Sequence, residues 1–311
     1  MKRASKNIII GFVVLLAITV SSCDKVENAY EEQATIDLDT TLYPGLWQDY
    51  LDNEYPVFPD NNNTDVNVLL EDYTGHKCNN CPDAATEAHT IHENYPDRIF
   101  VASIHIDPGA QLSFQYTENS GGYTTDHTNP DAVKYGETFE NGYNFIGNPQ
   151  GTVNRKTVDG KMFDFYGTWQ SRATDIMNTN DLKFNLQSVF NFYESKNGGF
   201  LHVEAEKITS EEIEVNTVVY VIQDTLTDWQ LMPNNTANEF YLHRDKHLGS
   251  IDNNAFGIQT FPADAPSGTK EVIDYSYEVP AGLDPENMHF LVYVFNTETY
   301  EILQVIKQKL K

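Results

Sequence analysis

The chain has 311 residues and a formal net charge of −26 at pH 7, because 46 acidic residues outnumber 20 lysines and arginines. This length suggests two domains better than one. So acidic a surface argues against nucleic acid or anionic lipid as a partner, since phosphate binding draws its affinity from lysine and arginine. The sequence has no P-loop, dinucleotide fingerprint or GxSxG motif, and we expect no cofactor.

The N-terminal segment has the layout of an export signal. A basic start at residues 1–6 precedes a largely apolar run at residues 8–20, which is too short for a bilayer span of about 20 helical residues. Its ending, Val20-Ser21-Ser22-Cys23, resembles a bacterial lipobox, in which the signal is cut before the cysteine and that cysteine receives lipid. We therefore expect residues 1–22 to be a lipoprotein signal peptide and Cys23 to carry the membrane anchor. The alternative is an ordinary signal peptide with an incidental cysteine.

The next part of the chain predicts a tether followed by an α/β domain. Residues 23–64 are acidic, contain Asn and Pro clusters and have no sustained period, which is typical of a tether and lead-in with one short helix around Trp47. A strand at 66–73, a helix after Pro82 and a strand at 99–106 then form a βαβ unit, so parallel pairing is expected. The pattern continues with a helix, two strands joined by a turn and a last helix, at 131–141, 145–156, 161–167 and 168–177.

After about Leu182 the pattern changes to short alternating strands separated by turn residues. This is the signature of an antiparallel sandwich, of which an immunoglobulin-like domain is the commonest small form. We place the boundary between Asn178 and Asn185, which gives domains at 65–182 and 183–311. The strands are expected at residues 184–193, 199–208, 215–224, 270–280, 288–296 and 300–308.

Cys78 and Cys81 stand between the first strand and its helix, where they could cycle in a redox reaction, clamp a metal or staple the chain. With Cys23 assigned to lipid they are left as a pair, and an exported compartment permits a disulfide. Zinc is disfavoured, because eight helical residues from Cys81 to His89 span about 12 Å, whereas zinc bonds are about 2.1 to 2.3 Å long. We expect no metal site.

A redox role has more support. A cysteine at a helix N-terminus has its thiolate favoured by the dipole and by free N–H groups, which can bring its pKa to about 3.5 to 7.5. Cys78 precedes the helix and has His76 and Lys77 beside it. We therefore expect Cys78 to be the attacking thiol and Cys81 the resolving one.

The stretch VNVLLEDYTGHKCNNC, residues 66–81, resembles the thioredoxin superfamily. The resemblance implies that Asp72 is the buried acid that handles the proton of the second cysteine. It also implies that Gly147-Asn148-Pro149 is the cis-proline loop facing the disulfide, with Lys77 and Asn148 on the substrate side. Glu71 would take the place of Asp72 if the strand register slipped by one residue.

Some positions depart from the superfamily pattern. Lys77 replaces the usual tryptophan, Asn79-Asn80 replaces Gly-Pro, and Asn148 stands where Thr, Val or Ile often precedes the cis-proline. The exchange chemistry is still possible with these residues. Its direction, potential and substrate do not follow from the resemblance.

Most of the mature chain, together with the lipobox, is similar to a lipoprotein family named for a twenty-eight-kilodalton outer-membrane protein of Gram-negative bacteria. The likeness lies in the lipobox, in LLEDYTGHKCNNCPDAA and FIGNPQGTVNR, and in YLHRDKHLGSIDNNAFG and the closing ILQVI. It implies outer-membrane attachment and an α/β thioredoxin-like domain followed by an all-β immunoglobulin-like sandwich. We expect His243 and His247, within the fourth of these blocks, to be polar loop residues rather than a metal pair.

Two functions are consistent with these patterns. The first is thiol–disulfide exchange on exported proteins, for which Cys78, Cys81, Asp72 and Pro149 are the candidate catalytic residues. The second is a surface binding or adhesion lipoprotein with a structural disulfide, for which the aromatic loops around Tyr116, Tyr123 and Tyr143 are candidates. The membrane, reached through lipid on Cys23, is the expected partner in both cases, and the oligomeric state has no signal in the sequence.

Overall fold

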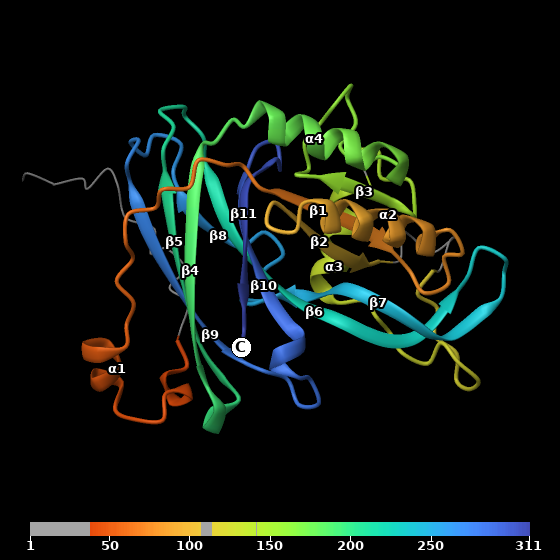
Figure 1. The fold of residues 1–311 in the computed structure, drawn as a ribbon, viewed down its shortest axis with the longest axis horizontal. Coiled ribbons are helices and arrows are strands. Elements are labelled where there is room, and N and C mark those ends of the chain that lie inside the picture. Colours follow the sequence, from red (N-terminus) through yellow and green to blue (C-terminus); the bar gives the residue numbers. More distant parts are fainter. Residues whose placement is uncertain (1–37, 107–113, 141) are drawn as a thin grey trace, which may run out of the picture. The chain divides into compact units, whose positions relative to one another are not determined.

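The computed structural model describes residues 38–106, 114–140 and 142–311 (Figure 1). In chain order the helices and strands are α1 (Trp47–Asn53), β1 (Val68–Thr74), α2 (Cys81–Asn94), β2 (Ile99–His105), α3 (Pro130–Phe139), β3 (Gln150–Val153), α4 (Trp169–Thr179), β4 (Phe184–Tyr193), β5 (Gly198–Lys207), β6 (Val215–Leu231), β7 (Ala237–Ser250), β8 (Ile258–Phe261), β9 (Lys270–Glu278), β10 (Met288–Asn296) and β11 (Ile302–Lys309). Within these residues an 8-stranded sheet has the order β11-β10-β6-β7-β2-β1-β3, with β8 beside β6, and a 3-stranded sheet has the order β4-β5-β9. Neither sheet closes on itself.

The N-terminal part of the large sheet is the expected βαβ unit. β1 pairs with β2 in parallel and with β3 antiparallel, and α2 connects the two parallel strands. Both parallel strands are buried along their whole length, as expected for parallel strands whose two faces are both covered. α2 and α4 cover one face of these strands and α3 packs on the other (Figure 1).

Alternation along β1 sends neighbouring acids to opposite faces of the sheet. Leu69 and Tyr73 pack in the core cluster that includes α3, whereas Val68 and Leu70 pack in the cluster that includes α2. Asp72 therefore faces α2, and Glu71 faces away from it.

The antiparallel region contains every strand expected after Leu182, with ends shifted by a few residues at most except in β6. β6 continues to Leu231 and pairs with β7, and neither this extension nor β7 and β8 was expected. The reason is chemical: buried positions of β7 carry His243, His247 and Ser250, so the strand has no apolar alternation. The expectation that the two histidines lie in a loop was therefore wrong.

The strand expected at 161–167 does not form. These residues make only isolated bridges, between Gly151 and Asp164 and between Val158 and Lys161. The neighbouring side chains of Met162 and Phe163 are both 1 % exposed and both pack in the core, whereas a strand would send them to opposite faces.

The described part of the expected tether packs on the antiparallel region. α1 follows a short 3₁₀ turn at Thr40–Leu42, and Tyr50 of α1 is fully buried against Phe200 of β5. The Tyr50 hydroxyl also contacts Nε2 of His202. Residues 38–64 thus add to the fold, and one short helix around Trp47 is confirmed.

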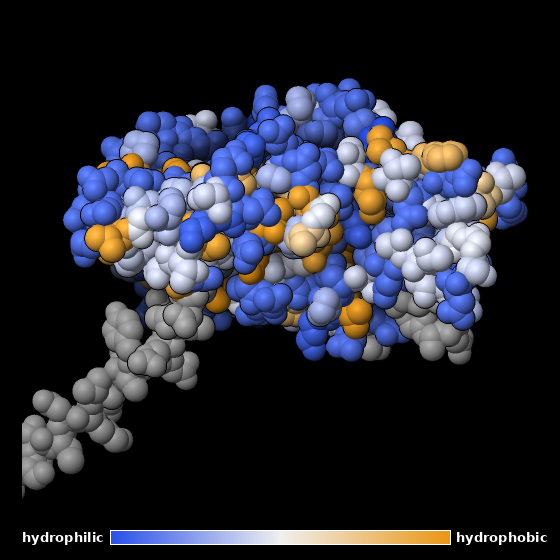
Figure 2. Space-filling view, turned by 90° about the horizontal axis from the view of Figure 1, so that it is seen from below, coloured by the Kyte–Doolittle hydropathy of each residue, from blue (hydrophilic) through white to orange (hydrophobic). Residues whose placement is uncertain are grey.

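One face of the molecule is mostly hydrophilic, with hydrophobic side chains scattered in small spots (Figure 2). This agrees with the strongly acidic composition. Over the ranges that the structure describes, no helix is both long and apolar enough to cross a bilayer.

Candidate redox site

Cys78 and Cys81 form a disulfide at the start of α2. β1 ends at Thr74, and the loop that follows folds back so that the Cys78 amide donates to the Gly75 carbonyl at 3.0 Å. Only glycine fits at position 75, because a Cβ there would lie 2.8 Å from the Phe114 carbonyl oxygen. Cys78 and Cys81 are 2 % and 1 % exposed, so the disulfide is buried in this conformation.

Asp72 lies behind the disulfide. It is fully buried and neither carboxylate oxygen has a hydrogen-bond partner among the described residues. Burial raises the pKa of Asp72 to about 7. Asp72 and Cys81 line one small cavity of about 20 Å³, which we call the inner cavity.

Glu71 has the opposite environment. Burial alone would raise its pKa, but Arg155 holds the pKa of Glu71 below its ordinary value through bonds of 2.7 and 2.9 Å to the carboxylate. Thr152 and Tyr220 donate to the same carboxylate. Glu71 is therefore a paired structural acid, and Asp72 is the acid beside the disulfide.

The predicted cis peptide bond between Asn148 and Pro149 is present. Gln150, the next residue, pairs with Tyr73, so the proline lies at the end of β1 from which the cysteine loop leaves. The Asn148 side-chain amide donates to the carbonyls of Thr74 and Ile106, at 2.8 and 3.1 Å.

Lys77 lies beside Cys78 but its ammonium group is engaged. Nζ is 2.7 Å from the Glu118 carboxylate and 4.5 Å from the ring centre of Tyr116. It also lies 4.8 Å from the ring centre of Tyr123. Of the three aromatic loop residues, Tyr116 is 60 % exposed, whereas Tyr143 packs against the core.

Sequence reasoning missed that the antiparallel region also builds this site. The outer part of the β6–β7 hairpin, residues 225–244, which we call the arm, lies against the cysteine loop (Figure 1). Gln230 of the arm donates through its side-chain amide to the Cys78 and Gly75 carbonyls, at 3.0 and 3.3 Å. The Leu231 amide donates to the His76 carbonyl at 2.8 Å. The weak signal for a strand in the arm is its aromatic pair, Phe240 and Tyr241, because aromatic residues are enriched in strands.

Four histidine rings, one of them on the arm itself, form a cluster beside the cysteine loop. The ring centre of His127 lies 5.3 Å from those of His76 and His243 and 5.0 Å from that of His105. Burial lowers the pKa of each of these rings, to about 3 for His127 and about 4 for His243. Among residues 38–106, 114–140 and 142–311, no three or more His, Cys, Asp or Glu side chains are placed to hold a metal ion.

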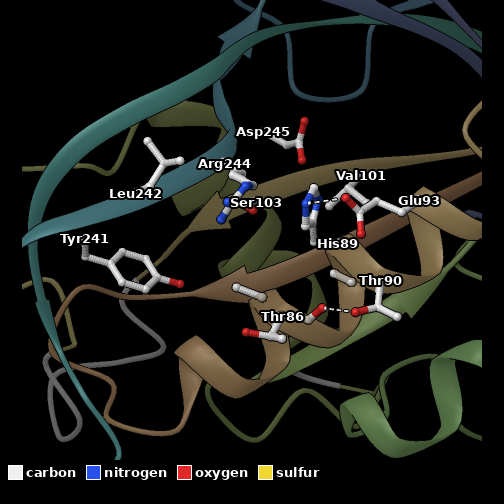
Figure 3. Close-up of a pocket in the computed structure, with 12 residues that line it drawn as sticks. Thr86, His89, Thr90, Glu93, Val101, Ser103, Tyr241, Leu242, Arg244 and Asp245 are labelled. Atoms are coloured by element: carbon white, nitrogen blue, oxygen red, sulfur yellow. Dashed lines mark hydrogen bonds and ion pairs between the residues drawn. The ribbon is translucent and has the colours of Figure 1, made fainter.

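A wider groove of about 370 Å³ opens between α2 and β7 (Figure 3). Side chains of Tyr241 and Arg244 point into it from the arm, opposite Thr86 and His89 of α2. The groove and the inner cavity have Ala85, Ser103, Tyr241 and Arg244 in common. The groove thus adjoins the cavity that contains Asp72.

The fold and the site together define a mixed α/β protein with a CxxC disulfide at the start of a helix and an antiparallel β region that reaches back to it. The family described as "Outer membrane protein Omp28" matches residues 136–311, more than half of the chain, and the chain belongs to this family. The description of the family as an outer membrane protein confirms the expected outer-membrane localisation. The match does not include Cys78 and Cys81.

Several solved structures resemble this chain. The chain is similar to HBP35 of Porphyromonas gingivalis, with a TM-score of 0.58 at 16% identity over 80% of this chain and 76% of that one. It also matches protein AGR_C_4864 from Agrobacterium tumefaciens, with a TM-score of 0.47 at 14% identity over 79% and 96% of the two chains. A domain of the outer membrane lipoprotein Omp28 from Porphyromonas gingivalis matches at 17% identity over 42% of this chain and 90% of that one, with a TM-score of 0.28. No curated protein sequence matches the chain.

Proposed function

We propose that this outer-membrane lipoprotein catalyses thiol–disulfide exchange on exported proteins. The observation that carries the proposal is that Cys81 and the unpartnered carboxyl of Asp72 line one cavity behind the disulfide. A carboxyl whose pKa is about 7 can take and return a proton at physiological pH. Lipid on Cys23, which lies outside the described residues, would hold the enzyme to the membrane.

In the reducing direction the chemistry has two steps. The Cys78 thiolate attacks a substrate disulfide, so that one substrate sulfur bonds to Cys78 and the other leaves as a thiolate. The Cys81 thiol then gives its proton to Asp72, and the Cys81 thiolate attacks the Cys78 sulfur. The Cys78–Cys81 bond forms and the second substrate thiolate leaves, so the substrate is reduced and the pair is oxidised. The same steps in reverse oxidise a substrate dithiol.

The substrate side of the site is assigned to the end of the sheet from which the cysteine loop leaves. Lys77, Asn148 and Pro149 all lie at this end. In this proposal Pro149 and its backbone neighbours face the substrate chain, and Lys77 favours the Cys78 thiolate. In the same proposal residues 65–182 are a thioredoxin-like domain and residues 183–311 an immunoglobulin-like sandwich, and the apolar cluster between the two sheets supports the second assignment.

Mixed-disulfide trapping tests the proposal. Cys81→Ala removes the resolving thiol, so we expect it to accumulate disulfide-linked complexes with exported proteins through Cys78. These complexes should dissolve on reduction and be absent from Cys78→Ala, the matched control. Equal recovery of partners from both variants would contradict exchange at this site.

A second function is favoured by the burial of the cysteines. Because both are almost fully buried and Gln230 bonds to the loop that carries them, the disulfide can instead be a structural staple in a binding lipoprotein. Tyr116, 60 % exposed beside Lys77, would then belong to the binding surface. Absence of trapped partners together with a disulfide that resists reduction would favour this function.

A further inference from the structure

The inner cavity contains polar groups whose bonding capacity is unused. Asp72 and His243 both line the cavity. Among the described residues, the two carboxylate oxygens of Asp72 and Nε2 of His243 have no hydrogen-bond partner. A buried polar group without a partner costs about 1–3 kcal/mol. The cavity volume of about 20 Å³ exceeds the roughly 10–15 Å³ that one water molecule requires. A water in contact with both residues can donate one hydrogen bond to an oxygen of Asp72 and one to Nε2 of His243.

The arm contributes four polar residues to the lining of this space, namely Gln230, Tyr241, His243 and Arg244. Tyr241 lines both the inner cavity and the groove, so it lies where the two meet. Burial raises the pKa of Tyr241 to about 12, and the negative charge of Asp72 adds to the effect, so the phenol is a proton donor at neutral pH. Burial lowers the pKa of His243 to about 4, so its neutral ring has an acceptor nitrogen.

We propose that the arm completes the proton path of the redox site: Tyr241 and His243 hold a water against Asp72, and the proton released by Cys81 moves through these groups to the groove between α2 and β7. The inference rests on the proposed function, because it assigns residues to the resolution step. Within that step Cys81 loses its thiol proton to Asp72, the Cys81 sulfur bonds to Cys78, and the substrate sulfur leaves as a thiolate. Asp72 then passes its proton through the water to solvent in the groove and is ready for another cycle.

The surroundings of the path are charged on several sides. His243 faces His76, His105, His127, Asp228 and Lys246. Tyr241 faces Asp72, Asp83 and Arg244. Because the two residues belong to the antiparallel region and Asp72 to β1, neither region forms the path alone.

The reaction of the reduced full-length protein with 5,5′-dithiobis(2-nitrobenzoate), in detergent, separates the two steps. Attack by Cys78 releases a first coloured thiolate, and resolution by Cys81 releases a second. We expect Tyr241→Phe and His243→Gln to slow the second release by about tenfold or more, as loss of proton transfer does, and to leave the first within about twofold. Asp72→Asn should slow the same step.

Matched controls come from residues of the same two types that line neither the inner cavity nor the groove. His92→Gln changes a histidine in the last turn of α2, and Tyr95→Phe removes a hydroxyl from a side chain that is 39 % exposed at the end of this helix. Both should keep wild-type rates in the two steps. If His243→Gln does not fold, Tyr241→Phe, which removes a single oxygen atom, is sufficient for the test.

Two results would overturn the proton path. In the first, Asp72→Asn slows the second release while Tyr241→Phe and His243→Gln resolve at the wild-type rate. In the second, these two variants change both steps equally, which would mean that the arm only shields the cysteines. If the wild-type protein gives no second release, the proposed function itself fails, and the path fails with it.

Discussion

At the scale of single residues, Glu71 and Asp72 show how one step along a strand changes the chemistry of a carboxylate. Both are completely buried. Glu71 meets Arg155 on one face of the sheet, and its charge is compensated by bonds as short as 2.7 Å. Asp72 points to the other face, where no described residue donates to it, and its charged form is disfavoured.

This difference predicts opposite effects of neutral substitutions in the oxidised protein. The folded-state pKa of Asp72, about 7, lies above its ordinary value of 3.8, so the folded protein binds a proton that the unfolded chain releases between these values. Stability from this group is therefore lost as pH rises from about 4 to 7. We expect the free energy of unfolding of Asp72→Asn, relative to that of wild type, to increase by a few kcal/mol when the pH is raised from 4 to 8, because each pKa unit is worth about 1.4 kcal/mol.

Denaturant unfolding at both pH values measures this gain. Glu71→Gln is the matched control, because it breaks a buried ion pair and should cost about 3–5 kcal/mol near neutral pH. An Asp72→Asn curve parallel to that of wild type across the pH range would show that Asp72 does not titrate near 7.

At the scale of elements, the arm determines how the cysteine loop is presented. Gln230 is 2 % exposed and its amide bonds to the Cys78 and Gly75 carbonyls. We expect Gln230→Ala to free this loop, so that a small phosphine reduces the disulfide several times faster, and to cost about 1–3 kcal/mol of stability. Gln187→Ala is the control, because Gln187 bonds to Pro59 and Glu204 away from the site. An unchanged rate of reduction in Gln230→Ala would contradict control by the arm.

The elements also show which parts of the structure the sequence could predict. The βαβ unit and the antiparallel strands β4 and β10 were predicted because their apolar periods are regular. β7 was missed because buried histidines replace apolar residues on it. Tyr241 and His243 of this strand, and Gln230 of the β6 extension, were therefore not predicted as site residues. Their contact with the cysteine loop joins residues about 150 positions apart, and such pairing cannot be read from local patterns.

At the scale of the whole molecule, the regions before and after residue 182 have one core in common. Leu69 and Phe100 of the parallel strands pack in the same cluster as Tyr220 and Tyr293 of the antiparallel region. Arg155 bonds to Glu71 and to the hydroxyls of both tyrosines. The boundary between Asn178 and Asn185 stays a prediction, and any separation there would expose this cluster.

Attachment to the membrane is a property of the whole molecule that we assign to one residue. Because we expect the lipobox-like sequence to direct the acyl chains to Cys23, Cys23→Ser should move the protein from the membrane fraction to the soluble fraction. Cys78→Ser, which leaves the lipobox intact, should stay with the membrane. A Cys23→Ser protein that still fractionates entirely with membranes at the processed mass would refute lipid anchoring at this residue.

The reduction potential of the Cys78–Cys81 pair in the intact protein tests the central proposal most directly. Equilibration with glutathione or dithiothreitol buffers, followed by thiol labelling, measures it. A pair that exchanges with exported proteins should have a potential between about −270 and −120 mV, the range of known exchange catalysts. A potential below about −300 mV would make the disulfide a structural staple and would contradict the exchange function.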